Sequence, residues 1–260
     1  MKVGLFEKTK SSDSIEHIIK MLDSASIEHS FDIGNDIDFI FSIGGDGTLL
    51  DVVPFVKNTE IPILGINFGR LGFLSGVEPD KLNEALSNLK NGNYTIINRQ
   101  LLHVEASSPI NSPFAMNEVT LLRNSFGSML NIDVFVNDIF LNTYKGDGLI
   151  ISTPTGSTAY NLSCGGPILL PDGENIILTP IASHTLTVRP IVLHSNNEIK
   201  IRISTRNSDE TFNINLDARQ HIVRNGETIK IYKENFYIKT VLLPNSNFFD
   251  TLREKLKWGM

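Results

Sequence analysis

The stretch DFIFSIGGDGTLLDVV, residues 38–53, places three glycines and one carboxylate (Gly44-Gly45-Asp46-Gly47) between two apolar runs. The run from Phe39 to Ile43 is short, rich in β-branched and aromatic side chains and bounded by glycine, which predicts a buried strand. From Thr48 onwards the apolar pattern resumes in a form typical of a helix start. A strand, a glycine turn and a helix N-terminus present free N–H groups and a positive dipole end, which favour a phosphate.

The carboxylate of Asp46 is unexpected in a turn of this kind. Gly44, Gly45 and Gly47 permit backbone angles closed to other residues and let another molecule approach the main chain. A carboxylate among these amides repels a phosphate, so phosphate binding alone does not explain it. It is explained if a hydroxyl must be deprotonated, or a metal held, beside that phosphate. An exposed Asp in a tight turn is the alternative that this stretch leaves open.

Composition restricts the class of protein. The 260 residues suffice for one large domain or two modest ones, and 41% hydrophobic with 20% charged residues is a globular balance. The net charge of −6 argues against nucleic-acid binding, which depends on positive charge to neutralise the phosphates. The single cysteine, Cys164, fits a reducing compartment. Since no apolar stretch approaches membrane-spanning length, we expect a cytoplasmic protein without nucleic-acid or membrane partners.

The first part of the chain alternates strand and helix patterns. Strands are predicted over residues 3–6, 39–43 and 61–66, and helices over residues 14–22, 49–56 and 81–89. Strands separated by helices are typical of a parallel sheet in an α/β domain. We therefore expect an α/β domain over residues 1–95 that carries the GGDG turn.

The pattern changes after Asn91-Gly92-Asn93 to short strands with turn signals. Strands are predicted over residues 132–136, 139–144, 198–204, 211–216, 227–233 and 236–241. This texture predicts a mostly antiparallel β-sandwich over residues 96–245. Residues 248–258 resemble a basic amphipathic helix, and we expect the segment 246–260 to pack on the first domain.

A search for nucleotide and metal motifs leaves four polar, glycine-rich stretches. The sequence has no G-x-x-x-x-G-K-[ST], no strand-to-helix G-x-G-x-x-G, no H-E-x-x-H and no C-x-x-C. The four stretches are GGDG (44–47), GINFGRLGFL (65–74), MNEVTLLR (116–123) and YKGDGLIISTPTGSTAYNLSCGGP (144–167). The fourth combines hydroxyls, glycines and one Tyr, which suit a ribose and a base. The residues alone thus indicate a phosphoryl-handling site and a nucleoside-like site.

In this order and spacing, the four stretches resemble the NAD kinases, which phosphorylate the 2′-hydroxyl of the adenosine ribose of NAD. GGDG alone also occurs in phosphofructokinases and in diacylglycerol and sphingosine kinases, whereas NE followed by GDG and STPTGSTAYNLSCGGP is specific. The resemblance covers nearly the whole chain from Ile43. It implies a two-domain fold, NAD and ATP as substrates, a divalent metal (Mg²⁺) and a homo-oligomer, either a dimer or a tetramer.

The resemblance also implies roles for particular residues. Asp46 matches the catalytic aspartate, and Gly44, Gly45, Gly47 and Thr48 form the turn for ATP and substrate phosphates. The expected contacts with NAD are Asp46, Gly47, Asn117, Glu118, Lys145, Asp147, Thr158, Ala159, Tyr160, Asn161, Leu162, Ser163, Ala182 and Arg219. Two positions depart from the family pattern: Lys145 stands where Arg is frequent before GDG, and Arg219 in LDARQ stands where Gln is frequent.

Two other functions are compatible with parts of this pattern. A lipid kinase of the diacylglycerol or sphingosine type shares the GGDG turn, but the acidic balance argues against a membrane-facing basic surface. A non-catalytic NAD(P)-binding protein would keep the nucleoside-like site, but it has no need of the Asp46 carboxylate. We therefore predict an NAD kinase.

Overall fold

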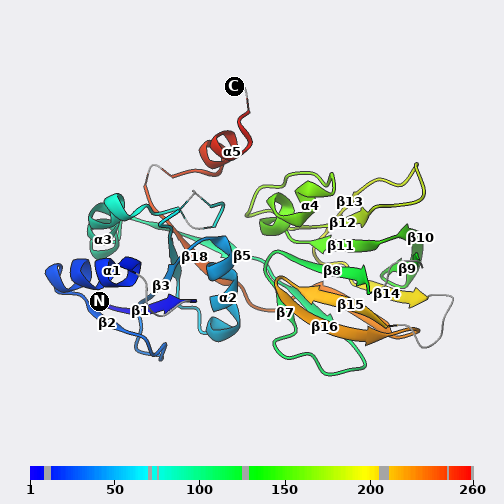
Figure 1. Cartoon of the computed structure of the whole chain (residues 1–260), viewed down its shortest axis with the longest axis horizontal. Coiled ribbons are helices and arrows are strands. Elements are labelled where there is room, and N and C mark those ends of the chain that lie inside the picture. Colours follow the sequence, from blue (N-terminus) through cyan, green and yellow to red (C-terminus); the bar gives the residue numbers. More distant parts are fainter. Residues whose placement is uncertain are drawn as a thin grey trace. The chain divides into compact units, whose positions relative to one another are not determined.

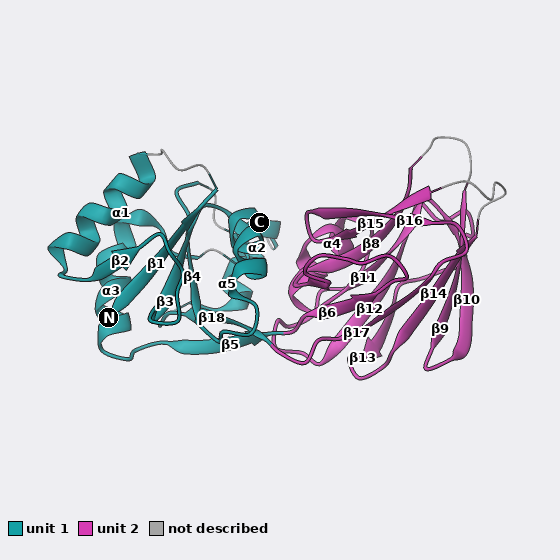
Figure 2. Cartoon of the chain, turned by 90° about the horizontal axis from the view of Figure 1, so that it is seen from below, with its two compact units in different colours: residues 1–99, 237–260 teal, residues 100–236 magenta. Residues whose placement is uncertain are grey.

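The computed structural model describes residues 1–8, 13–69, 72–74, 76–124, 129–204, 211–244 and 246–258. The chain divides into two compact units, coloured separately in Figure 2. Unit 1 contains residues 1–99 and 237–260, and unit 2 contains residues 100–236.

Unit 1 is built on a six-stranded sheet of order β2-β1-β3-β4-β18-β5. The strands are β1 (Lys2–Glu7), β2 (Glu28–Ser30), β3 (Phe39–Ile43), β4 (Ile63–Ile66), β5 (Thr95–Arg99) and β18 (Ile238–Leu242). All neighbours are parallel except β5, which runs antiparallel to β18. Every residue of β3 is buried, which matches its uninterrupted apolar sequence. The predicted parallel sheet of an α/β domain is confirmed.

The helices of unit 1 cover both faces of this sheet. They are α1 (Asp13–Ser24), α2 (Asp46–Val56), the 3-10 turn η1 (Pro79–Lys81), α3 (Leu82–Lys90) and α5 (Phe248–Leu256). Buried residues of α1 and α3 share one core cluster with the sheet, and α2 lies on the opposite face (Figure 1). The ring centre of Phe248 in α5 lies 6.3 Å from that of Phe73, so the C-terminal helix packs on unit 1. No helix in the described ranges is long and apolar enough to cross a membrane.

One predicted strand lies in a different sheet from the one expected. The alternating run 236–241 is predicted to belong to the β-rich domain, but β18 lies between β4 and β5 in unit 1. It pairs with β5 over five positions, from Ile238 opposite Arg99 to Leu242 opposite Thr95. The alternation of apolar and polar residues predicts a half-buried strand, but it does not predict which strands this one pairs with. The assignment of this strand was therefore wrong although its type was right.

Unit 2 consists of two antiparallel six-stranded sheets, ordered β10-β9-β14-β17-β6-β7 and β13-β12-β11-β8-β15-β16. The first sheet contains β6 (Leu102–Glu105), β7 (Phe114–Ala115), β9 (Leu130–Val136), β10 (Ile139–Gly146), β14 (Ile199–Ser204) and β17 (Thr228–Lys233). The second contains β8 (Glu118–Arg123), β11 (Gly148–Ser152), β12 (Asn175–Ile181), β13 (Ile191–His194), β15 (Thr211–Leu216) and β16 (Arg219–Arg224). Two short helical turns follow β11, namely η2 (Thr155–Thr158) and α4 (Tyr160–Ser163).

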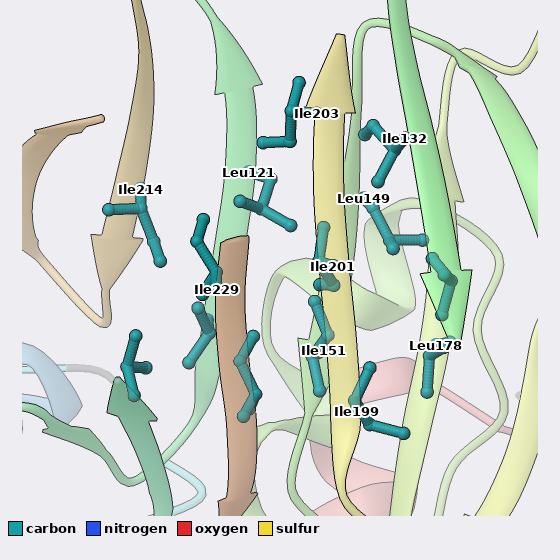
Figure 3. Close-up of a cluster of buried hydrophobic side chains, with 14 of the residues drawn as sticks. Leu121, Ile132, Leu149, Ile151, Leu178, Ile199, Ile201, Ile203, Ile214 and Ile229 are labelled. Carbon is teal, nitrogen blue, oxygen red and sulfur yellow. The ribbon is translucent and has the colours of Figure 1, made fainter. Parts of the chain in front are cut away.

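Inward-facing side chains of both sheets form the core of unit 2. Leu121 and Ile151 from one sheet and Ile201 and Ile229 from the other belong to one buried cluster (Figure 3). Burying one such side chain completely contributes about 1.5–3 kcal/mol. This arrangement confirms the predicted antiparallel sandwich.

Candidate functional site

The glycine turn of unit 1 joins β3 to α2. The Gly44 N–H donates to the Ile66 carbonyl at 2.8 Å, which ties the turn to the end of β4. Gly44 has φ +145°, and a Cβ atom there would lie 2.3 Å from Thr48 Oγ1. Only glycine satisfies both conditions.

Gly45 and Gly47 leave the start of α2 open. Both are exposed, and a Cβ atom on either would meet nothing within 4 Å in the described structure. Gly45 occupies the N-cap position of α2, where no side chain caps the helix. The positive end of the helix dipole is thus accessible to an anion at these backbone positions.

Asp46, the first residue of α2, is held by a loop that follows β4. Its Oδ2 accepts a hydrogen bond from the Phe73 N–H at 2.7 Å, and its Oδ1 accepts one from the Leu74 N–H at 3.0 Å. The side chain is half-buried. The two amides fix the plane of the carboxylate at the glycine turn, so the structure brings together the GGDG stretch and the GINFGRLGFL stretch.

The loop after β4 is anchored by the buried Asn67. Its Oδ1 accepts from the Gly69 N–H at 2.9 Å, and its N–H donates to the Val77 carbonyl at 2.8 Å. Residues 70 and 71 of the GINFGRLGFL stretch lie outside the described residues. The anchored ends of this loop support the amides that hold Asp46.

In unit 2, a buried carboxylate holds the Asn117–Glu118 turn, which leads from β7 into Glu118, the first residue of β8. Asp217 Oδ2 accepts from the Met116 N–H at 2.9 Å, and its Oδ1 accepts from the Asn117 and Glu118 N–H groups at 2.7 Å and 3.2 Å. The Asp217 side chain is only 3% exposed. The sequence pattern did not single out this residue, although LDARQ shows an Asp two residues before Arg219.

Three polar side-chain atoms of these segments have no hydrogen-bond partner in the part of the chain that the structure describes. They are Asn117 Oδ1, Glu118 Oε2 and Thr155 Oγ1, and all three are buried. Gly156 packs against Asn117 so closely that a Cβ atom on it would lie 2.1 Å from the Asn117 carbonyl oxygen. Leaving a buried polar group unsatisfied costs about 1–3 kcal/mol. Each of these atoms is therefore suited to a ligand that supplies hydrogen bonds.

The protonation of Glu118 is set by its surroundings. Burial, and secondarily the negative charge of Asp217, raise the pKa of Glu118 to about 8. Its carboxyl is then mainly protonated at neutral pH and can both donate and accept a hydrogen bond. Burial also raises the pKa of Asp217, while the amides of residues 116–118 and the Arg219 guanidinium act in the opposite direction.

The hydroxyl-rich stretch begins where β11 ends beside β8. Ser152 pairs with Glu118 in the sheet register. Thr153 Oγ1 donates to the Met116 carbonyl at 2.6 Å and accepts from the Gly156 N–H at 3.1 Å. The MNEV and STPTGST stretches, which are separate in sequence, therefore form one continuous structure.

Residues 158–163 differ in what they offer a ligand. Tyr160 is 39% exposed and Ser163 is exposed, while Thr158, Ala159 and Leu162 are half-buried. Asn161 is fully buried: its amide donates to the Ser157 and Pro167 carbonyls, and its oxygen accepts from Thr179 Oγ1 at 2.6 Å. Its side chain thus holds the stretch in place, which sequence reasoning did not distinguish from ligand binding.

Asp147, Lys145 and Ala182 lie where β10, β11 and β12 adjoin. Asp147 Oδ1 lies 3.0 Å from Arg123 Nε, and the Asp147 N–H donates to the Ile181 carbonyl. Lys145 is exposed. Ala182 is exposed and has φ +44°, a left-handed conformation that costs a residue with a side chain about 1 kcal/mol.

Arg219 contacts the protein backbone at the Asn117–Glu118 turn. Its Nη1 donates to the Ser112 carbonyl at 2.7 Å, and its Nη2 donates to the Phe114 carbonyl. The guanidinium carbon lies 5.5 Å from the centre of the Phe114 ring. The residue expected to contact NAD is therefore engaged in holding the segment that leads to Asn117.

Comparisons with known proteins agree on one family. Residues 7–94 match the model of the ATP-NAD kinase N-terminal domain, and residues 116–243 match that of the C-terminal domain. The NAD kinase of Flavobacterium johnsoniae is 46% identical over 233 residues, which are 87% of this chain and 78% of that protein. The NAD kinase of Bacteroides fragilis is 43% identical over 232 residues, 88% of this chain and 79% of that protein.

Solved structures show the same fold. An NAD kinase from Archaeoglobus fulgidus in complex with ATP has a TM-score of 0.83 and 27% identity and covers 99% of both chains. Yeast NADH kinase complexed with NADH has a TM-score of 0.86 at 23% identity and covers 100% of this chain and 88% of that one. The two family domains and both structural neighbours span the residues that form the two sites described above.

Proposed function

The chain belongs to the NAD kinase family, whose members transfer a phosphoryl group from ATP to NAD, and we propose that Asp46 is its catalytic residue. The family match extends over both domains, which favours this activity over the lipid-kinase alternative. The observation that carries the assignment of Asp46 is its position at the exposed N-terminus of α2, with both carboxylate oxygens oriented by the Phe73 and Leu74 amides.

Each part of the glycine turn has a role in the proposed mechanism. The backbone at Gly45 and Gly47, together with the dipole of α2, binds donor phosphates, because no side chain covers these positions in the described structure. The Asp46 carboxylate accepts the proton of the ribose 2′-hydroxyl as that oxygen bonds to the γ-phosphorus of ATP, while the bond from this phosphorus to the β–γ bridging oxygen breaks and ADP leaves. Transfer of this kind depends mainly on positioning and charge stabilisation.

The nucleoside contacts in the proposal come from unit 2. Asn117, Glu118 and Thr155 supply buried polar atoms that lack partners within the described residues, and NAD carries the ribose hydroxyls and base nitrogens to satisfy them. The half-exposed ring of Tyr160 packs against the base or ribose of NAD. Asp147 and residues 158–163 complete the NAD site in this proposal, with Asn161 serving to hold the stretch.

A divalent metal also fits the donor chemistry of the glycine turn. The described residues contain no cluster of three or more His, Cys, Asp or Glu side chains able to hold a metal. Mg²⁺ is nevertheless commonly held by one or two carboxylates together with substrate phosphates, and Asp46 provides such a carboxylate beside the open turn. When bound, Mg²⁺ neutralises charge on the donor phosphates.

The proposal extends to assembly and compartment. The sandwich of unit 2 has edge strands β7, β10, β13 and β16, and exposed sheet edges require cover. We propose a cytoplasmic homo-oligomer, most simply a tetramer, with unit 2 central to its contacts. Light scattering tests this, since a mass near the 28.9 kDa of one chain at micromolar concentration contradicts it.

A coupled assay with purified protein, NAD, ATP and Mg²⁺ tests the function. Formation of NADP that depends on all three is the expected result. Phosphorylation of diacylglycerol or sphingosine without phosphorylation of NAD would establish the lipid-kinase alternative. Saturable NAD binding by calorimetry without turnover under any of these conditions would establish a non-catalytic binding protein.

A further inference from the structure

The turn between β15 and β16 hydrogen-bonds to the Asn117–Glu118 turn through a side chain as well as through the backbone. Strands β15 and β8 are paired side by side, with Leu216 opposite Val119 (Figure 1). Beyond this ladder, the Asp217 N–H donates to the Glu118 carbonyl at 3.0 Å. The Asp217 carboxylate then accepts from three consecutive main-chain N–H groups, those of residues 116, 117 and 118.

Arg219 binds the complementary groups of the same segment. Its guanidinium donates to the carbonyls of Ser112 and Phe114, on the N-terminal side of the turn, and lies over the Phe114 ring. One hairpin turn thus satisfies N–H groups through Asp217 and carbonyl groups through Arg219. The two side chains also lie 3.9 Å apart, between Arg219 Nη2 and Asp217 Oδ2.

We propose that Asp217 and Arg219 are positioning residues that hold the Asn117–Glu118 turn in its NAD-binding form. This rests on the proposed assignment of the NAD site to unit 2. The backbone of the turn is bound by the hairpin, while Asn117 Oδ1 and Glu118 Oε2 stay buried and unpaired among the described residues. If Asp217 and Arg219 served stability alone, the buried polar atoms that they hold would be expected to have protein partners.

Asp217 also acts electrostatically, because its negative charge affects the pKa of Glu118. The negative charge of Asp217 contributes, after burial, to the raised pKa of Glu118. The other titratable groups coupled to Glu118 are Tyr160 and Cys164. Removing the Asp217 charge lowers the pKa of Glu118, so any pH dependence of NAD binding that follows Glu118 must shift to lower pH.

The test compares D217N and R219Q with wild type by steady-state kinetics and by calorimetry with NAD alone. In D217N, an NH₂ group replaces one acceptor oxygen and opposes a main-chain N–H. We expect the KM and Kd for NAD to rise about 10- to 100-fold, as for lost hydrogen bonds to a charged group, with kcat within about threefold. In R219Q, whose side chain is partly exposed, we expect a rise of about 3- to 10-fold.

D138N provides a matched control. Asp138 also occupies a hairpin turn with positive φ, between β9 and β10, and pairs with Lys200 at the surface. Its substitution should leave the KM for NAD unchanged. In the wild type, NAD affinity should change with an inflection near the pKa of Glu118, about 8. The inflection should move to lower pH in D217N and disappear in E118Q.

Wild-type NAD affinity in folded D217N or folded R219Q overturns the proposal, as does a fall in kcat with an unchanged KM and an unchanged pH inflection. If D217N does not fold, R219Q decides alone. Because calorimetry does not depend on turnover, NAD binding by an inactive wild type refutes the proposed catalysis without affecting this test. Failure of the wild type to bind NAD refutes the proposed NAD site itself.

Discussion

Asp46→Asn separates catalysis at the glycine turn from binding elsewhere. The substitution keeps the size of the side chain but replaces one oxygen by an NH₂ group. In the structure, the two oxygens accept from Phe73 N–H at 2.7 Å and Leu74 N–H at 3.0 Å, so one amide must face another donor. This costs about 1–3 kcal/mol of stability, and loss of a negative charge at the N-terminus of α2 adds about 0.3–1 kcal/mol.

The effect on turnover should be far larger than this loss of stability. Removing a group that accepts the hydroxyl proton lowers kcat by about 10²- to 10⁴-fold. NAD affinity should stay within about twofold of wild type, because the proposed nucleoside contacts lie in unit 2. The assay measures kcat, NAD affinity and the denaturation midpoint on the same folded preparation.

Asp13→Asn is the matched control, because Asp13 occupies the first turn of α1 as Asp46 does in α2. It should reproduce the helix-dipole part of the stability change and leave kcat unchanged. If Asp46→Asn retains more than about a tenth of wild-type kcat, Asp46 is not the catalytic residue. If Asp46→Asn loses NAD affinity and turnover together, the division of roles between the two units is wrong.

Three further predictions follow from the same geometry. Tyr160→Ala should weaken NAD binding by about 1–3 kcal/mol in calorimetry, and wild-type affinity would remove Tyr160 from the site. Gly44→Ala should lower the melting temperature, because Gly44 has φ +145° and faces Thr48, whereas Gly47→Ala should fold normally and raise the KM for ATP; full activity of the second variant would mean that the open turn binds no phosphate. For Glu118, the pKa of about 8 in the folded protein lies above its ordinary value of 4.5, so its contribution to stability is present at acidic pH and is lost as pH rises through 8. Glu118→Gln should therefore gain stability relative to wild type between pH 5 and 8, by at most about 1.4 kcal/mol per pH unit in denaturant titrations, and parallel profiles would contradict the buried carboxyl.

The types of most predicted elements depend on local sequence alone. The apolar run of β3, the glycine turn and the helix start of α2 follow one another within residues 38–53, and each can be identified from its neighbours in the chain. The same holds for the alternating strands of unit 2, whose inward residues form the sandwich core. Steric limits on glycine and the periods of helix and strand act over a few residues, which is why they are visible in sequence.

Partners across the fold could not be predicted in this way. The residue pattern of β18 predicts a strand. Its place between β4 and β5 arises because the chain, after forming unit 2 with residues 100–236, returns to unit 1. Likewise, Asn161 and Arg219 have residue types suited to a ligand, yet their hydrogen bonds go to the protein. A polar side chain forms hydrogen bonds with the groups that the fold places next to it. The spacing of residues in the sequence does not predict which groups these are.

The sequence by itself determined that a carboxylate stands in a glycine turn at a helix start, and that an amide and a carboxyl precede a strand. Only the tertiary structure decided what orients them. The amides of Phe73 and Leu74 are 27 and 28 residues from Asp46. Asp217 is about 100 residues from the N–H groups that donate hydrogen bonds to its carboxylate. Such contacts form because packing of the sheets brings distant backbone groups to hydrogen-bonding distance, where a buried carboxylate must find donors.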